Sequence, residues 1–188
     1  MGLSILKRVG MGVGLATIMI IAVGLFLPRT YTIERSIVIT ATQQHIHDLC
    51  GDLEQWPRWT PWFKADPGIE ITMGGLTSGE GAHQTWHGKG SRGELTFTRS
   101  DPDWGVGFDL RLNGGSTDAV CTMRYALVDS GVRVTWDMTG DAGYNLLDRF
   151  FGLMMDTVIG PMFDEGLTRL KLVAEEAPAE DPGISDLG

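Results

Sequence analysis

Apolar residues stand at every second position in several successive stretches of the chain, and this spacing then changes to one of three or four. The alternating stretches are residues 69–73, 82–87, 95–97, 106–112, 121–127 and 132–138. Turn residues such as Asn113-Gly114-Gly115 and Asp129-Ser130-Gly131 separate them. Alternation with short turns predicts antiparallel strands that have one apolar and one solvated face.

From Leu147 to Val173 the apolar residues recur every three or four positions, which predicts one long amphipathic helix. Gly160-Pro161 predicts a kink in it, because proline removes a helical hydrogen bond. A curved antiparallel sheet and one long helix bury their apolar faces against each other. We therefore expect an α+β domain over residues 30–176.

The segments before the alternating region are shorter. Tyr31 to Thr40 is rich in β-branched residues and predicts a first strand, and residues 42–50 predict a helix that Thr42 or its predecessor caps. Residues 56–63 contain two prolines and have room only for a short helix and a turn. Residues 177–188 combine prolines with acidic residues and predict a disordered tail.

The chain also has an uncharged apolar run at residues 9–27, preceded by Lys7 and Arg8 and followed by Pro28 and Arg29. As a helix this run is about 28 Å long at ~1.5 Å per residue, close to the thickness of a bilayer core. We expect a single transmembrane anchor. The alternatives are a cleaved signal peptide, which the bulky residues before Pro28 disfavour, and a buried soluble helix.

The charges beside the run predict its orientation. Lys7 and Arg8 favour a short cytoplasmic tail at residues 1–8 and an extracytoplasmic domain, although Arg29 and Arg35 weaken this bias. The formal net charge of −9 argues against a nucleic-acid partner. Cys50 and Cys121 lack metal-ligand spacing, and two buried free thiols are favoured over a disulfide.

The order of these elements resembles the helix-grip fold of the SRPBCC, START-like (Bet v 1-like) superfamily, and specifically its polyketide cyclase/dehydrase branch. The matching segments are Glu34-Arg35-Ser36-Ile37-Val38-Ile39, Trp56-Pro57-x-Trp59-x-Pro61-Trp62, Gly79-x-Gly81, Val132-x-Val134-x-Trp136 and Gly160-Pro161-x-Phe163. The resemblance implies a cavity between the sheet and the long helix that holds a hydrophobic small molecule or lipid. The family is functionally mixed, so a cyclase- or dehydratase-like enzyme and a non-catalytic envelope interaction module stay open.

The candidate ligand-binding residues are the large apolar side chains of the strands, the long helix and the tryptophan segment. They are Trp59, Trp62, Trp86, Phe97, Phe108, Tyr125, Trp136, Met154, Val158 and Met162. Each of them has the alternative of simply packing in the core. Residues 56–62 have two interpretations. They either gate the cavity mouth or contact the membrane surface, or they form a rigid lock between helix and sheet. We favour the lock.

Polar chemistry is sparse in the sequence. Gln84 and Arg99 are expected to face inward because they alternate with Trp86 and Phe97. His83 and His87 have ligand-like spacing, but in a strand residues four apart lie about 13 Å apart, too far to share one ion. We expect no metal and no cofactor, and no nucleophile motif or phosphate-binding loop is present in the sequence.

Overall fold

One antiparallel sheet of seven strands forms the frame of the molecule, in the order β1-β7-β6-β5-β4-β3-β2. The structure is a computed structural model that describes residues 12, 14–15, 18–62, 66–89, 92–112 and 117–176. The strands are β1 (Thr30–Ile39), β2 (Glu70–Met73), β3 (His83–His87), β4 (Arg92–Asp101), β5 (Gly105–Leu112), β6 (Thr117–Val128) and β7 (Gly131–Asp141). Every strand pairs antiparallel with its neighbours, and β1 forms one edge of the sheet by pairing with the last strand, β7.

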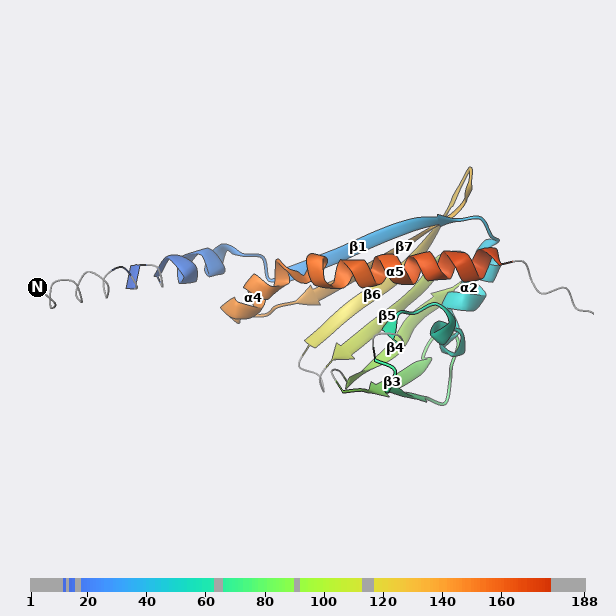
Figure 1. Ribbon diagram of the computed structural model, residues 1–188, viewed down its shortest axis with the longest axis horizontal. Coiled ribbons are helices and arrows are strands. Elements are labelled where there is room, and N and C mark those ends of the chain that lie inside the picture. Colours follow the sequence, from blue (N-terminus) through green and yellow to red (C-terminus); the bar gives the residue numbers. More distant parts are fainter. Residues whose placement is uncertain are drawn as a thin grey trace, which may run out of the picture.

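Helices cover the concave face of this sheet (Figure 1). They are α2 (Gln43–Cys50), the 3-10 helix η1 (Leu53–Arg58), α4 (Leu146–Gly152) and α5 (Met155–Glu175). Thr42 caps α2, because its hydroxyl oxygen accepts a hydrogen bond from the His45 N–H at 3.2 Å. The α5 helix lies along β1 and crosses the front of the sheet, while α2 and η1 cover the end farthest from α4 (Figure 1).

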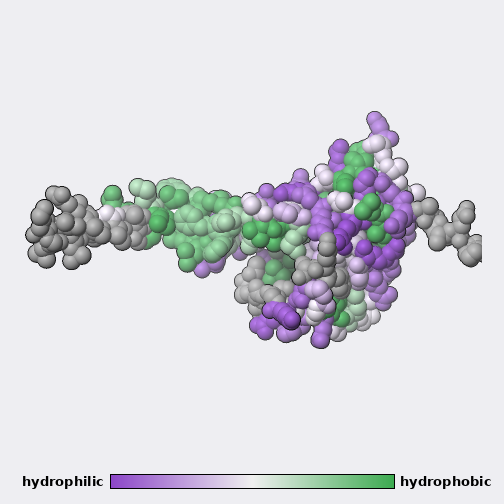
Figure 2. Space-filling model, in the orientation of Figure 1, coloured by the Kyte–Doolittle hydropathy of each residue, from purple (hydrophilic) through white to green (hydrophobic). Residues whose placement is uncertain are grey.

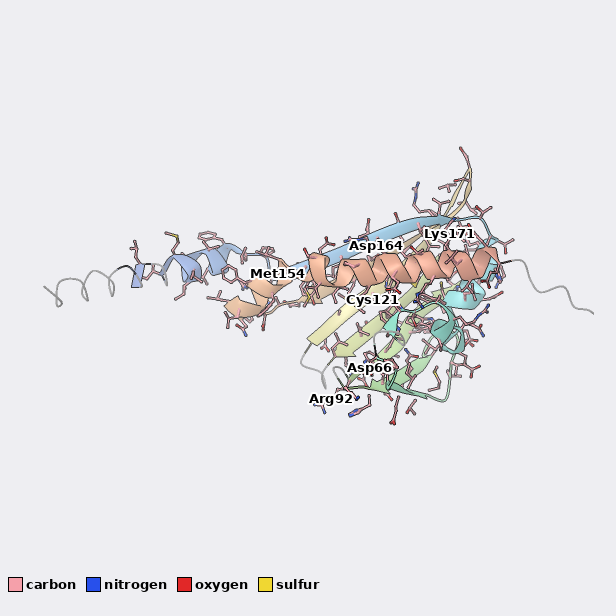
Figure 3. The ribbon with its side chains drawn as sticks, viewed as in Figure 1. Asp66, Arg92, Cys121, Met154, Asp164 and Lys171 are labelled. Carbon is pink, nitrogen blue, oxygen red and sulfur yellow. The ribbon has the colours of Figure 1, made fainter. Side chains whose placement is uncertain are left out.

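Polar contacts hold α5 along β1. Lys171 of α5 donates a hydrogen bond to the Val38 carbonyl at 2.7 Å, and the Thr40 N–H donates to the Glu175 carboxylate at 2.6 Å. Arg35 of β1 bridges Asp156 and Asp164, at 2.8 Å and 3.2 Å. Figure 3 shows Asp164 and Lys171 on the α5 side that faces β1. Gly160 lets α5 approach here, since a Cβ at this position would collide with the Arg35 guanidinium.

The sequence predictions for the domain are largely confirmed. The predicted strands are all present, and the helix at residues 42–50 begins one residue later behind its Thr42 cap. The short helix expected within residues 56–63 begins earlier, because η1 spans Leu53–Arg58. The long C-terminal helix differs in one respect. It is interrupted at Leu153–Met154, and α5 then continues through Gly160-Pro161.

The N-terminal helix, residues 18–26, lies beside α4 and beyond the end of β1 (Figure 1). Its apolar side chains are exposed, and Gly24 alone is buried, against Leu146 and Phe150 of α4. Among the helices in the described part of the chain, none is both long and apolar enough to cross a membrane. The expected anchor at 9–27 lies partly outside the described residues, and the segments 1–8 and 177–188 lie wholly outside them.

Candidate functional site

A packed aromatic cluster occupies the centre of the space between the sheet and α5. Trp136 of β7 stacks on Phe163 of α5, with 4.1 Å between ring centroids and 10° between planes. Trp59 and Trp62 meet the Trp136 ring edge-on at 5.8 Å and 5.9 Å. Trp56 extends the cluster to Phe97 and Phe108. Five of the predicted residues, Trp59, Trp62, Phe97, Phe108 and Trp136, therefore lie together.

Trp56 and Trp59 of this cluster also bind the C-terminal end of α2. The Trp56 indole N–H donates to the Cys50 carbonyl at 2.9 Å, and that of Trp59 donates to the Leu49 carbonyl at 3.0 Å. Carbonyls at a helix C-terminus have no intrahelical partner, so these bonds satisfy them. Both side chains are almost fully buried, which favours the rigid lock between helix and sheet over a gate at these two positions.

Several apolar side chains are only partly buried at the end of the concave face nearest α4. We call these residues, Tyr31, Leu110, Met155, Ile159 and Met162, the open end. Leu110 and Tyr31 lie in one cross-strand row that runs through Ala119 and Gly140. The Tyr31 ring covers Gly140, where any Cβ would collide with it, and burial raises the pKa of the Tyr31 hydroxyl.

Met154 and Val158 do not face the sheet, so the expectation that they line a cavity opposite Phe108 and Trp136 is wrong. Both side chains are 58% exposed. Residues two positions apart on a helix point about 200° apart. Because α5 turns Gly160 and Phe163 inward, Val158 points outward. Figure 3 shows Met154 at the junction of α4 and α5, at the end of the molecule that carries the N-terminal helix.

Tyr125 lies apart from the aromatic cluster, beneath α2. Its ring meets His47 edge-on at 6.0 Å, and its hydroxyl has only the weakly bonding Cys50 thiol beside it. Burial raises the pKa of Cys50 to about 12 and raises the pKa of Tyr125 well above its usual value. Burial lowers the pKa of His47, whose Nε2 lies 3.3 Å from the Ser100 hydroxyl.

Cys50 and Cys121 are both buried free thiols, as the sequence favours. Burial raises the pKa of Cys121 as well, with the nearby Asp137 and Asp109 adding to it. A thiol acts as a nucleophile through its thiolate form. Both cysteines therefore stay protonated at neutral pH and serve as small apolar packing residues.

Trp86 stands at the opposite edge of the sheet from α5. Its ring lies against Gly93, where a Cβ would collide with it, and it borders an open hollow of about 600 Å³ on the outer sheet face. The other residues lining this hollow are Glu70, Thr72, Thr85, His87, Arg92, Gly93, Glu94 and Arg111.

A second hollow of about 450 Å³ lies beside α2 and is lined by His47, Asp48, Gly51, Asp52, Ser78, Gly79 and Ser100. Most residues that line the two hollows are polar or charged, and neither hollow is predominantly apolar as the site of a hydrophobic ligand usually is.

Of the two polar residues expected to face inward, the structure places one inside. Gln84 is buried, and its Oε1 atom has no hydrogen-bond partner. Arg99 is exposed, paired with Asp101 at 3.2 Å and stacked over Trp104 at 4.2 Å. The expectation for Arg99 is wrong because a β-bulge between Phe97 and Arg99 shifts the register of β4 and turns the side chain outward.

The interior offers little acid–base chemistry. The buried polar side chains in the described part of the chain are Thr60, Gln84 and Arg149. No carboxylate and no imidazole belongs to this fully buried set, and the described residues include no group of His, Cys, Asp and Glu that could hold a metal ion. Four buried side-chain atoms in the described part of the chain have no hydrogen-bond partner: the Trp136 Nε1, the Gln84 Oε1, the Tyr125 hydroxyl and the His47 Nδ1. Such atoms suit the recognition of a polar group on a ligand better than proton transfer.

Sequence reasoning overlooked Phe163 and Arg35. Phe163 stands one position after the expected Met162 and supplies the ring that stacks on Trp136. Arg35 stands two positions from both Ile33 and Ile37 in β1. Residues two apart in a strand share a face, so this spacing already places Arg35 on the inner face. This signal in the sequence predicts an inward charge that needs a partner on the helix above it.

Residues 30–175 match the model of the family described as "Polyketide cyclase / dehydrase and lipid transport". The chain belongs to this family. It is a member of the SRPBCC superfamily with the α+β helix-grip fold, as its sequence resemblance implied. No curated protein is similar enough in sequence to be matched.

Solved structures with the same fold have low sequence identity to this chain. CV1439 from Chromobacterium violaceum is 13% identical with a TM-score of 0.58, covering 78% of this chain and 99% of its own. A protein from Thermobifida fusca is 19% identical with a TM-score of 0.57, covering 74% and 90%. The di-domain ARO/CYC StfQ of the steffimycin biosynthetic pathway is 12% identical with a TM-score of 0.59, covering 78% of this chain and 52% of StfQ. At such identities the likeness establishes the fold alone.

Proposed function

We propose that this protein is a single-pass membrane protein whose START-like domain binds a hydrophobic small molecule or lipid at the open end of its concave face. The observation that carries the proposal is the partly buried apolar surface of Tyr31, Leu110, Met155, Ile159 and Met162. Small-molecule sites are concave and mainly apolar, with a few placed polar groups. The flexible methionines of α5 suit a ligand of irregular shape.

The family description names both a reaction and lipid transport, and the buried residues favour binding over a reaction. The fully buried polar residues of the described chain include no general base, and the buried thiols are protonated. A cyclase- or dehydratase-like reaction needs a group that removes a proton. A second candidate, the non-catalytic interaction module, is favoured by the aromatic cluster that fills the centre of the domain.

The membrane anchor and the extracytoplasmic side are parts of the same proposal. The uncharged run at 9–27 supports the anchor, as does the exposure of apolar side chains around the N-terminal helix. A helix that is apolar on all sides requires an apolar environment on all sides. Lys7 and Arg8 support a cytoplasmic N-terminus.

The substitution Ile159→Trp tests ligand binding at the open end. The larger side chain fills the space that we assign to the ligand, so lipid that co-purifies with the full chain should fall at least about tenfold. The lipid is measured by organic extraction and mass spectrometry after detergent washing. Leu172→Trp is the matched control, because Leu172 is an exposed apolar residue of the same helix.

A parent chain that carries no extractable lipid, together with a strongly destabilised Ile159→Trp variant, would show that side chains fill the domain. That result supports the interaction module. Equal lipid in both tryptophan variants would place the ligand elsewhere.

A further inference from the structure

A stripe of large apolar side chains on α4 and the start of α5 is left uncovered by the residues that the structure describes. Leu147, Phe151, Met154 and Val158 are 66%, 62%, 58% and 58% exposed. Leu147 and Phe151 stand four residues apart on α4, and Met154 and Val158 stand four apart at the start of α5, which places each pair on one side of its own helical segment. We call them the exposed stripe. Contiguous exposed apolar surface of this kind marks an interaction site.

The exposed stripe is joined to the N-terminal helix through Arg149, which points away from the stripe. The Arg149 Nη1 donates to the carbonyls of Gly24 and Leu25 at 3.3 Å and of Leu27 at 3.4 Å. Its Nε donates to the Gly143 carbonyl at 3.2 Å. A cation at a helix C-terminus satisfies free carbonyls and opposes the negative end of the helix dipole. Arg149 thus fixes the N-terminal helix and α4 to each other.

Gly24 adds a close contact at the same joint. A Cβ at this position would lie 3.1 Å from the Phe150 ring and 3.3 Å from Leu146. The two helices therefore pack directly. Figure 2 shows hydrophobic surface over this part of the molecule, whereas hydrophilic surface dominates the opposite end of the domain.

An aromatic and a charged side chain stand where this apolar surface meets the domain. Tyr144 is 81% exposed, and the Arg29 guanidinium lies 4.1 Å above its ring. Arg29 also pairs with Asp141 at 3.6 Å. Exposed tyrosines and basic residues beside an apolar helix are typical of the headgroup layer of a bilayer.

We propose that α4 lies in the headgroup layer of the membrane that anchors the N-terminal helix, with the exposed stripe reaching the acyl chains. The occupant of this surface is the lipid bilayer, because the apolar side chains of the N-terminal helix stay exposed on the sides that α4 does not cover, and a second copy would cover only one of these sides. The inference rests on the anchor of the proposed function and extends it. Tyr31 of the open end lies against Gly152 of α4, so the open end adjoins the surface that we assign to the membrane.

The test measures membrane depth on the full chain in phosphatidylcholine/phosphatidylglycerol nanodiscs. Single cysteines replace Leu147, Phe151 or Ile20 and carry an environment-sensitive NBD label, which lipids brominated near the headgroup or deeper then quench. Leu127→Cys and Leu172→Cys are the controls, since both positions are exposed and apolar but lie outside the stripe. The buried thiols of Cys50 and Cys121 serve as the labelling blank in the parent chain.

We expect at least about twofold quenching at positions 147, 151 and 20, and none at 127 or 172. Quenching at position 20 without quenching at 147 and 151 overturns the inference and leaves the anchor intact. No quenching at position 20 overturns the anchor, and the inference with it. Energy transfer between labels on different copies at 147 and 151, without lipid quenching, would identify a second copy as the occupant and also overturn the inference.

Discussion

Arg149 joins two segments that lie far apart in the sequence, and it does so through backbone carbonyls. The substitution Arg149→Ala leaves the carbonyls at the end of the N-terminal helix without this donor. We expect a loss of about 2 kcal/mol in the free energy of unfolding, measured by denaturant titration of the full chain in mild detergent. Arg149→Lys keeps the charge and should recover part of this loss.

Arg133→Ala is the control for this prediction, because Arg133 is an exposed arginine on β7. If Arg149→Ala costs no more stability than Arg133→Ala, the joint between the two helices does not exist in solution. Restored stability in Arg149→Lys would show that the positive charge at the helix end contributes to the joint.

Single residues show where the sequence was informative and where it was not. The inward position of Gln84 follows from strand alternation, and burial confirms it. Arg99 obeys the same alternation but lies beyond the bulge in β4, which adds one residue and reverses every later side chain. Nothing in the local sequence marks the bulge, so the outward position of Arg99 was not predictable.

The α5 helix likewise has one feature that the sequence predicted and one that it did not. Its period of three to four predicted a helix correctly, but not which part of its apolar side meets the sheet. Phe163, Gly166 and Leu170 face the core, whereas the stripe N-terminal to them is exposed. An amphipathic pattern identifies the apolar face of a helix. Which neighbouring element buries that face depends on tertiary packing.

Gly166 allows α5 to pack closely on the aromatic cluster. A Cβ there would lie 3.0 Å from the Trp136 ring, which Phe163 and two tryptophans hold in place. Gly166→Leu should therefore cost about 1–3 kcal/mol in thermal unfolding, despite the better helix propensity of leucine. Thr168→Leu, on the exposed side of the same helix, should change stability by less than ~0.5 kcal/mol. Equal stability of the two variants would show that the α5–Trp136 contact is loose.

At the scale of the whole molecule, the fold was predictable because strand alternation, turn residues and helical periodicity all indicate the same architecture. The candidate site was only partly predictable. Of the ten residues expected to line it, Met162 alone belongs to the open end, five form the packed cluster, and Trp86, Tyr125, Met154 and Val158 lie away from that cluster. The division of apolar residues between packed core and uncovered surface depends on the three-dimensional arrangement of α4, α5 and the N-terminal helix.

The most direct test of ligand binding at the open end uses a fatty acid that carries a photoreactive diazirine, added to the full chain in nanodiscs. After illumination, the labelled residues are mapped by peptide mass spectrometry. We expect labels on the concave face, at Leu110, Ile159 or Met162, in addition to those on the lipid-exposed helices. Labels confined to the N-terminal helix and α4, with none on the concave face, would contradict ligand binding by this domain.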